Sequence, residues 1–105
     1  MPEFLKTKAD FNTALAGAGG KLVVVDFTAS WCGPCQMIAP KFQVMSEEFK
    51  DVVFYKVDVD ENDETAESQG ISAMPTFIFY RDGKKVDSLT GASEAKLRQK
   101  LDQLK

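Results

Sequence analysis

The chain has 105 residues, 44% of them hydrophobic, which suffices for one domain with one packed core and is too short for two ordinary domains. Its formal net charge of −3, without a long run of like charges, argues against nucleic acid or an anionic membrane surface as a partner. The absence of histidine excludes Cys–His and Ser–His catalysis and every metal site built on an imidazole.

The first half of the chain predicts a strand, a helix and a second strand, in that order. Residues 4–6 fit a short strand, and Thr7 then fits the N-cap of a helix. This helix has an apolar stripe within residues 11–18 and ends among the glycines at 17–20. Residues 22–27 are apolar and β-branched except for Asp26, which is typical of a strand buried on both faces.

A long amphipathic helix is predicted after this strand. Apolar side chains recur at helical spacing, at Cys35, Ile38, Phe42, Met45 and Phe49. We then expect a strand over residues 52–59 and a short exposed helix over residues 62–69 that stops at Gly70.

The last third predicts a hairpin and a closing helix. Residues 76–80 form an apolar strand, and the Asp82-Gly83 pair predicts a tight turn that returns the chain over residues 85–89. Ser93 fits the N-cap of a helix with Leu97, Leu101 and Leu104 on its inner face. The order βαβαβαββα predicts an α/β fold with a mixed sheet and helices on both faces, formed by residues 1–105 as a single domain.

The segment Trp31-Cys32-Gly33-Pro34-Cys35 holds both cysteines of the chain, at the carboxyl end of a predicted central strand. This cysteine pair has three possible interpretations: half of a zinc site, a structural disulfide bridge or a redox-active dithiol. Zinc needs four ligands, which two cysteines without histidine cannot supply unless two chains share the metal. A bridge across two intervening residues constrains the unfolded chain little. The redox interpretation is therefore favoured.

Position predicts different roles for the two sulfurs. Cys32 lies at a helix N-terminus, where the dipole and free N–H groups stabilise a thiolate, so we expect it to be the more exposed thiol and the nucleophile. Cys35 lies one turn further on, on the buried stripe, and should resolve the mixed disulfide that Cys32 forms with a substrate. Gly33 allows a partner backbone to approach, and Pro34 stiffens the turn.

Three further features are candidates for the site, and each has a plainer alternative. Asp26 is either a hydrogen-bonded carboxylate at a strand end or a buried proton acceptor for Cys35. Trp31 either covers an edge of the core or forms one wall of a peptide groove. The Met74-Pro75 bond is either an ordinary trans bond at a strand start or a cis bond beside the site.

With Asp26 before the cysteines and Met74-Pro75-Thr76 after them, the chain resembles the thioredoxin family, which is the standard example of this cysteine motif. The resemblance extends from end to end through Pro40, Asp58-Val59-Asp60 and Gly91-Ala92. It implies a central five-stranded mixed sheet flanked by four helices, with the strand ending at Asp26-Phe27 in the middle.

The resemblance also implies the chemistry of the site. Cys32 would attack, Cys35 would resolve, Asp26 would accept a proton and Pro75 would be cis. The substrate groove would be lined by Trp31, Gly33, Pro34, Ala73, Met74 and Gly91. A flavin- and NADPH-dependent thioredoxin reductase would recharge the dithiol, and the domain itself would hold no cofactor and no metal.

The resulting hypothesis is a cytoplasmic, monomeric protein-disulfide reductase whose partners are disulfide-containing proteins and thioredoxin reductase, with no nucleic acid or membrane partner. The rivals are a redox-independent binding subunit that uses the same groove and a disulfide-forming oxidase, against which Gly33-Pro34 argues. The lack of a signal peptide and the single possible disulfide favour the cytoplasm.

Some residues depart from the usual family pattern. Gln36 stands where the family usually carries lysine or arginine, so one cation near the dithiol is missing. Asn62, Gln69 and Ala73 occupy positions where vertebrate relatives often carry further cysteines, so regulation through a third thiol is not expected. Lys56 resembles a lysine that lies near the buried aspartate in bacterial relatives.

Overall fold

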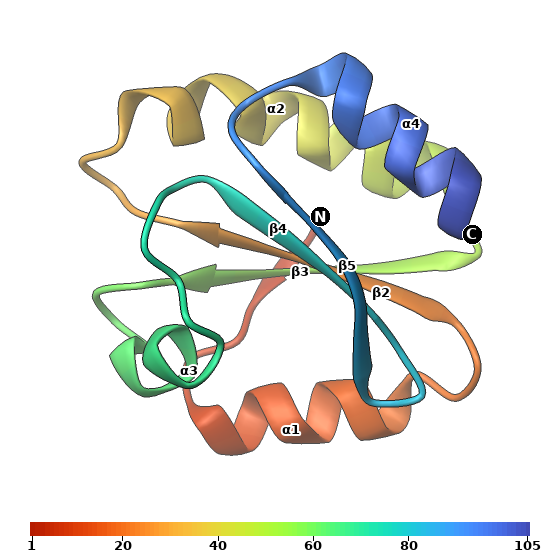
Figure 1. The fold of residues 1–105 in the computed structure, drawn as a ribbon, viewed down its shortest axis with the longest axis horizontal. Coiled ribbons are helices and arrows are strands. Elements are labelled where there is room, and N and C mark those ends of the chain that lie inside the picture. The colour runs from red at the N-terminus through yellow and green to blue at the C-terminus, as the bar shows by residue number, and fades with distance from the viewer.

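A computed structural model describes residues 1–105 as one five-stranded sheet with four helices (Figure 1). The elements are β1 (Glu3–Phe4), α1 (Lys8–Gly17), β2 (Leu22–Thr28), α2 (Gly33–Glu48), β3 (Val52–Asp58), α3 (Asp63–Ser68), β4 (Thr76–Arg81), β5 (Lys84–Thr90) and α4 (Glu94–Leu104). This order confirms the prediction, and the boundaries differ from the predicted ones by only one or two residues.

The strands lie in the order β1-β3-β2-β4-β5, so β2 is the central strand, as the resemblance implied. It pairs in parallel with β3 and antiparallel with β4, and β4 and β5 form the predicted antiparallel hairpin. The hairpin turn is made by Asp82 and Gly83, whose φ angles are 54° and 76°. Two successive positive φ values suit Asp-Gly, because neither residue is a bulky or β-branched one.

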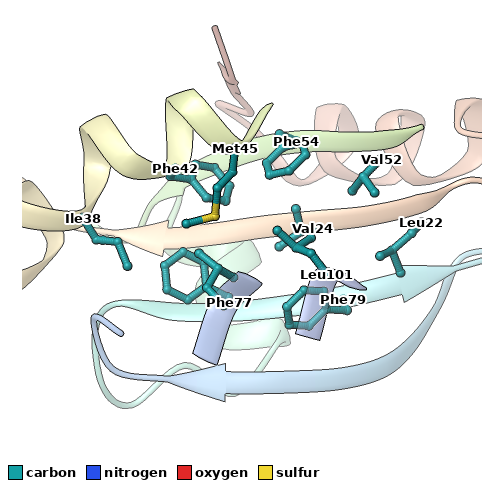
Figure 2. Close-up of a cluster of buried hydrophobic side chains, with 11 residues drawn as sticks. Leu22, Val24, Ile38, Phe42, Met45, Val52, Phe54, Phe77, Phe79 and Leu101 are labelled. Atoms are coloured by element: carbon teal, nitrogen blue, oxygen red, sulfur yellow. The ribbon is translucent and has the colours of Figure 1, made fainter. Parts of the chain in front are cut away.

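Helices cover both faces of the sheet, α2 and α4 on one side and α1 and α3 on the other (Figure 1). The α2–α4 side holds the larger apolar cluster (Figure 2), formed by Leu22, Val24, Ile38, Phe42, Met45, Val52, Phe54, Phe77, Phe79, Leu97 and Leu101. The opposite cluster contains Leu5, Phe11, Val23, Val25, Phe27, Val57, Ile78 and Tyr80. Successive β2 side chains therefore alternate between the two clusters, as expected for a strand.

A side chain caps the N-terminus of every helix. Thr7, Cys32, Asn62 and Ser93 each accept a hydrogen bond from the backbone N–H three residues further on. Hydroxyl and amide caps are common, but a sulfur cap at α2 is not among the preferred residue types. The cap of α2 therefore distinguishes this helix start from the other three.

Candidate active site

Cys32 and Cys35 form a disulfide at the start of α2, just beyond the carboxyl end of β2. Their Cα atoms lie 5.3 Å apart, within the usual range for a disulfide. Cys32 is 7% exposed and Cys35 is fully buried. Cys32 is thus the more accessible sulfur, as predicted, although both side chains are largely covered in this oxidised state.

Backbone hydrogen bonds fix the Cys32 sulfur at the end of the helix. The N–H of Cys35 donates to Cys32 Sγ at 3.3 Å, and the N–H of Cys32 donates to the carbonyl of Ala29 at 3.2 Å. Pro34 lies in the first turn, where its lack of an N–H removes no helical bond. The helix end thus directs an N–H dipole at Sγ, an arrangement that stabilises negative charge on this atom.

Asp26 is completely buried, and neither of its carboxyl oxygens has a hydrogen-bond partner in the protein. Two residues beyond Val24 on β2, it lies on the sheet face covered by α2, the helix that carries Cys35 on its buried stripe. Burial raises the pKa of Asp26 from an ordinary 3.8 to about 7, against an opposing effect of the nearby Lys56 ammonium. Of the two interpretations of Asp26, this environment favours the buried proton acceptor, because the protein supplies the carboxyl group with no hydrogen bond.

Lys56 lies beside Asp26 because the two residues are register partners in the parallel pairing of β2 and β3. Its side chain is half-buried, and its Nζ sits 4.9 Å from the centre of the Phe4 ring. The ammonium makes no ion pair within 4.0 Å of a carboxylate. Its influence on Asp26 is thus a charge effect through space rather than a salt bridge.

Trp31 is 67% exposed and does not belong to the core, so the core-edge interpretation of this residue is wrong. Its indole N–H donates to Asp60 Oδ2 at 2.7 Å. This contact joins the loop after β2 to the loop after β3. Sequence reasoning did not place Asp60 in the site. One feature of the sequence does point to Asp60: it follows the carboxyl end of β3. Because β3 is parallel to β2, this end lies at the same edge of the sheet as the loop that carries Trp31.

The segment Ala73–Thr76 approaches the disulfide from the start of β4. The Met74-Pro75 bond is cis, and the Met74 carbonyl oxygen lies 3.8 Å from Cys32 Sγ. The Thr76 hydroxyl donates to the Ala73 carbonyl at 2.6 Å, which holds this segment in place. Met74 also packs against the small apolar cluster of Ala29, Cys32 and Cys35.

Gly91 is held beside this segment by a backbone bond, since its N–H donates to the Pro75 carbonyl at 2.9 Å. Its φ of 107° is a conformation in which a side chain would be strained. Direct contacts thus join three of the predicted segments, 31–35, 73–75 and 91, and Asp26 lies on the sheet face that α2 covers.

No group of three or more His, Cys, Asp or Glu side chains is arranged to hold a metal ion. No helix is long and apolar enough to cross a membrane. The groups here that can react are the Cys32–Cys35 disulfide and the buried carboxyl group of Asp26. A disulfide across two intervening residues at a helix N-terminus, at the carboxyl edge of a mixed α/β sheet, is typical of the class of thiol–disulfide oxidoreductases.

Comparisons with known proteins identify the family. Residues 3–103 match the family described as Thioredoxin. The chain is 68% identical over 102 residues to thioredoxin of Geodia cydonium, covering 96% of each chain, and 44% identical over 104 residues to that of Homo sapiens, covering 99% of each. The X-ray structure of Fasciola hepatica thioredoxin superposes with a TM-score of 0.97 at 48% identity, with full coverage of both chains.

The chain belongs to the thioredoxin family. This membership and the disulfide formed by Cys32 and Cys35 identify it as a thiol–disulfide oxidoreductase that reduces protein disulfides. Family members act on disulfide-containing targets and are reduced by thioredoxin reductase.

Proposed function

We propose that Cys32 is the attacking sulfur and Cys35 the resolving one. In the reduced protein the Cys32 thiolate attacks one sulfur of a target disulfide. The target S–S bond breaks, a mixed disulfide with Cys32 forms, and the released target thiolate takes up a proton. The observation that carries this assignment is the cap: the Cys35 N–H points at Cys32 Sγ and stabilises charge there, while the buried Cys35 sulfur has no such donor.

Asp26 is proposed to serve the second step. Its carboxylate accepts the proton of the Cys35 thiol, directly or through water, and the resulting thiolate attacks Cys32 Sγ. The intramolecular disulfide forms, the mixed disulfide breaks, and the second target thiolate leaves and is protonated. Two electrons have then passed from the dithiol to the target. A pKa of about 7 supports this role, because both protonation states of Asp26 are populated near neutral pH.

The surface around the disulfide is proposed to bind the target as an extended peptide. Two observations support this: Trp31, Gly33 and Pro34 are exposed beside the cysteines in the sequence, and the Met74 carbonyl oxygen lies 3.8 Å from Cys32 Sγ. The N–H of Gly91 donates to the carbonyl oxygen of the neighbouring Pro75. The Met74 backbone is available to pair with an added strand, a mode in which main-chain bonds give affinity without strict sequence preference. We further propose that residues 1–105 act as one monomeric domain in the cytoplasm and are recharged by thioredoxin reductase, without nucleic-acid or membrane partners.

The test is reduction of insulin disulfides by dithiothreitol, with and without the protein. The wild-type chain should accelerate insulin precipitation, and Cys32→Ser should abolish the acceleration. A Cys32→Ser/Cys35→Ser double variant that keeps the wild-type rate would refute dithiol chemistry. It would leave a binding role for the groove.

A further inference from the structure

The side-chain amide of Gln36 reaches from the first turn of α2 back to the loop that precedes the helix. Its Nε2 donates to the Ala29 carbonyl oxygen at 2.9 Å. The same oxygen accepts the N–H of Cys32 at 3.2 Å. Ala29 is fully buried, so this carbonyl depends on these protein donors and uses both of its acceptor positions for them.

Gln36 also contacts the other end of this loop. Its backbone N–H donates to the Cys32 carbonyl oxygen at 3.2 Å. One residue therefore bonds both the first and the last residue of segment 29–32, which carries Trp31 and Cys32. Further along α2, Pro40 has no N–H to donate to the Gln36 carbonyl. The backbone of α2 therefore lacks the hydrogen bond from residue 40 to residue 36. In this turn, the side-chain bond of Gln36 provides an additional connection between the helix and the loop.

We propose that Gln36 is a positioning residue: its side-chain amide ties α2 to the Ala29 carbonyl and so holds Cys32 Sγ at the helix N-terminus. This inference rests on the proposed role of Cys32 as the attacking sulfur. It assigns Gln36 a geometric contribution in place of the charge that lysine or arginine would bring. The bond involves neither sulfur, so the tie does not require the disulfide and is available in the reduced protein.

The experiment compares reduced wild-type protein with Gln36→Met, which keeps the length of the side chain and removes its donor. Iodoacetamide alkylation of Cys32 is measured by peptide mass spectrometry across pH. Gln36→Met should move the midpoint of the pH–rate profile upward by about half a unit, equivalent to about threefold slower alkylation below the midpoint, because only the thiolate reacts. Gln43→Met makes the same chemical change two turns further along α2, without a bond to the loop, and should leave the profile unchanged.

Amide hydrogen exchange gives a readout on the tie itself. Exchange of the Cys32 N–H should accelerate about fivefold in Gln36→Met and stay at the wild-type rate in Gln43→Met. If Gln36→Met does not fold, Gln36→Glu replaces it. The new carboxylate cannot donate at neutral pH, so the protection factor of the Cys32 N–H, corrected for the intrinsic effect of pH on exchange, should be low there and return to the wild-type value in acid, where the protonated carboxyl group donates to Ala29.

An unchanged alkylation midpoint in Gln36→Met, or unchanged Cys32 exchange in the variant used, overturns the inference. A general loss of stability would accelerate exchange throughout the chain rather than at segment 29–32, and that result also counts against it. Failure of the proposed function looks different: wild-type protein would not reduce insulin, or iodoacetamide would label Cys35 first, whatever residue stands at position 36.

Discussion

At the scale of single residues, the site combines two groups with opposite electrostatic environments. Cys32 Sγ faces an N–H donor at a helix end, which favours its charged form. Asp26 is buried and receives no hydrogen bond from the protein, which favours its neutral form. The environment of Cys32 therefore stabilises negative charge on the sulfur, and the environment of Asp26 allows its carboxyl group to gain or lose a proton near neutral pH.

The different environments of the sulfurs predict different trapping behaviour. Cys35→Ser should accumulate mixed disulfides with target proteins, because the first covalent step has no resolving thiol to complete it. Cys32→Ser should capture few or none, since Cys35 is buried. Each variant is immobilised, exposed to lysate, and its captured proteins are compared on non-reducing gels. Equal capture by both variants contradicts the division of roles.

Asp26→Asn should slow turnover and increase stability at pH 7 and above. Burial raises the folded-state pKa of Asp26 to about 7, above its unfolded value, so its contribution to stability is fully present below about pH 4 and is lost as pH rises through 7. The complete loss is on the order of 4 kcal/mol. Asparagine does not titrate, so the stability deficit of the wild type relative to Asp26→Asn should grow with pH.

Denaturant unfolding at a series of pH values measures this difference. A deficit that shrinks as pH rises would mean that Lys56 stabilises the anion more than burial destabilises it. The variant Lys56→Met tests how far the Lys56 ammonium lowers the pKa of Asp26 against the effect of burial. Without the ammonium, the deficit should grow more steeply around pH 7, because the only nearby cation acting on Asp26 is gone.

At the scale of elements, α3 depends on two side-chain amides. Asn62 accepts from the Thr65 N–H at 3.3 Å as the helix cap and donates to the Leu5 carbonyl, next to β1, at 2.9 Å. At the other end of α3, Gln69 Oε1 accepts the Tyr80 hydroxyl at 2.7 Å. Polar side-chain bonds thus attach this short helix to the sheet.

Asn62→Ala should lower the free energy of unfolding by about 2 kcal/mol or more, because it removes a cap and leaves the Leu5 carbonyl without its side-chain donor. Thr7→Ala is the matched control. It removes only an exposed cap, that of α1, and should cost about 1 kcal/mol. Urea unfolding of both variants gives the comparison. Equal losses would show that the bond to Leu5 contributes nothing.

The sequence predicted these elements well because their signals are local. The apolar run of β2, the stripe of α2, the Asp-Gly turn and the Thr7 and Ser93 caps all depend on neighbouring residues. The contacts that complete the site are not local. Trp31 with Asp60 and Asn62 with Leu5 join positions far apart in the chain, and no spacing rule predicts which donor meets which acceptor. The same holds for the Gln36–Ala29 bond, because the sequence indicates only that position 36 carries no charge and not where the loop before α2 places the Ala29 carbonyl.

At the scale of the whole molecule, one apolar cluster connects the sheet with α2 and α4 (Figure 2). The Phe42 ring packs against two other aromatic rings of this cluster, with ring centres 5.2 Å from Phe54 and 5.6 Å from Phe77. Contacts that connect so many elements favour unfolding in a single cooperative transition.

Phe42→Ala should lower the free energy of unfolding by about 3–5 kcal/mol, because it opens a cavity among residues that cannot all close around it. The midpoint of unfolding should be lower in the variant than in the wild type. Within each protein, Trp31 fluorescence and far-ultraviolet circular dichroism should give the same midpoint. Val44→Ala, on the exposed side of the same helix, should change stability by no more than about 0.5 kcal/mol. Separate midpoints for the two probes would contradict a single cooperative unit.

The order of the strands also determines which strands are free to pair with the sheet of another copy of the chain. The most apolar strands, β2 and β4, lie inside the sheet and have no free backbone groups to offer a neighbour. The outer strands offer poor templates: β1 has only two residues, and β5 carries the exposed Lys84 and Lys85 and pairs with β4 through an irregular register. Short and charged edges resist edge-to-edge aggregation. The two free edges of this sheet therefore give neighbouring copies of the chain little backbone to pair with.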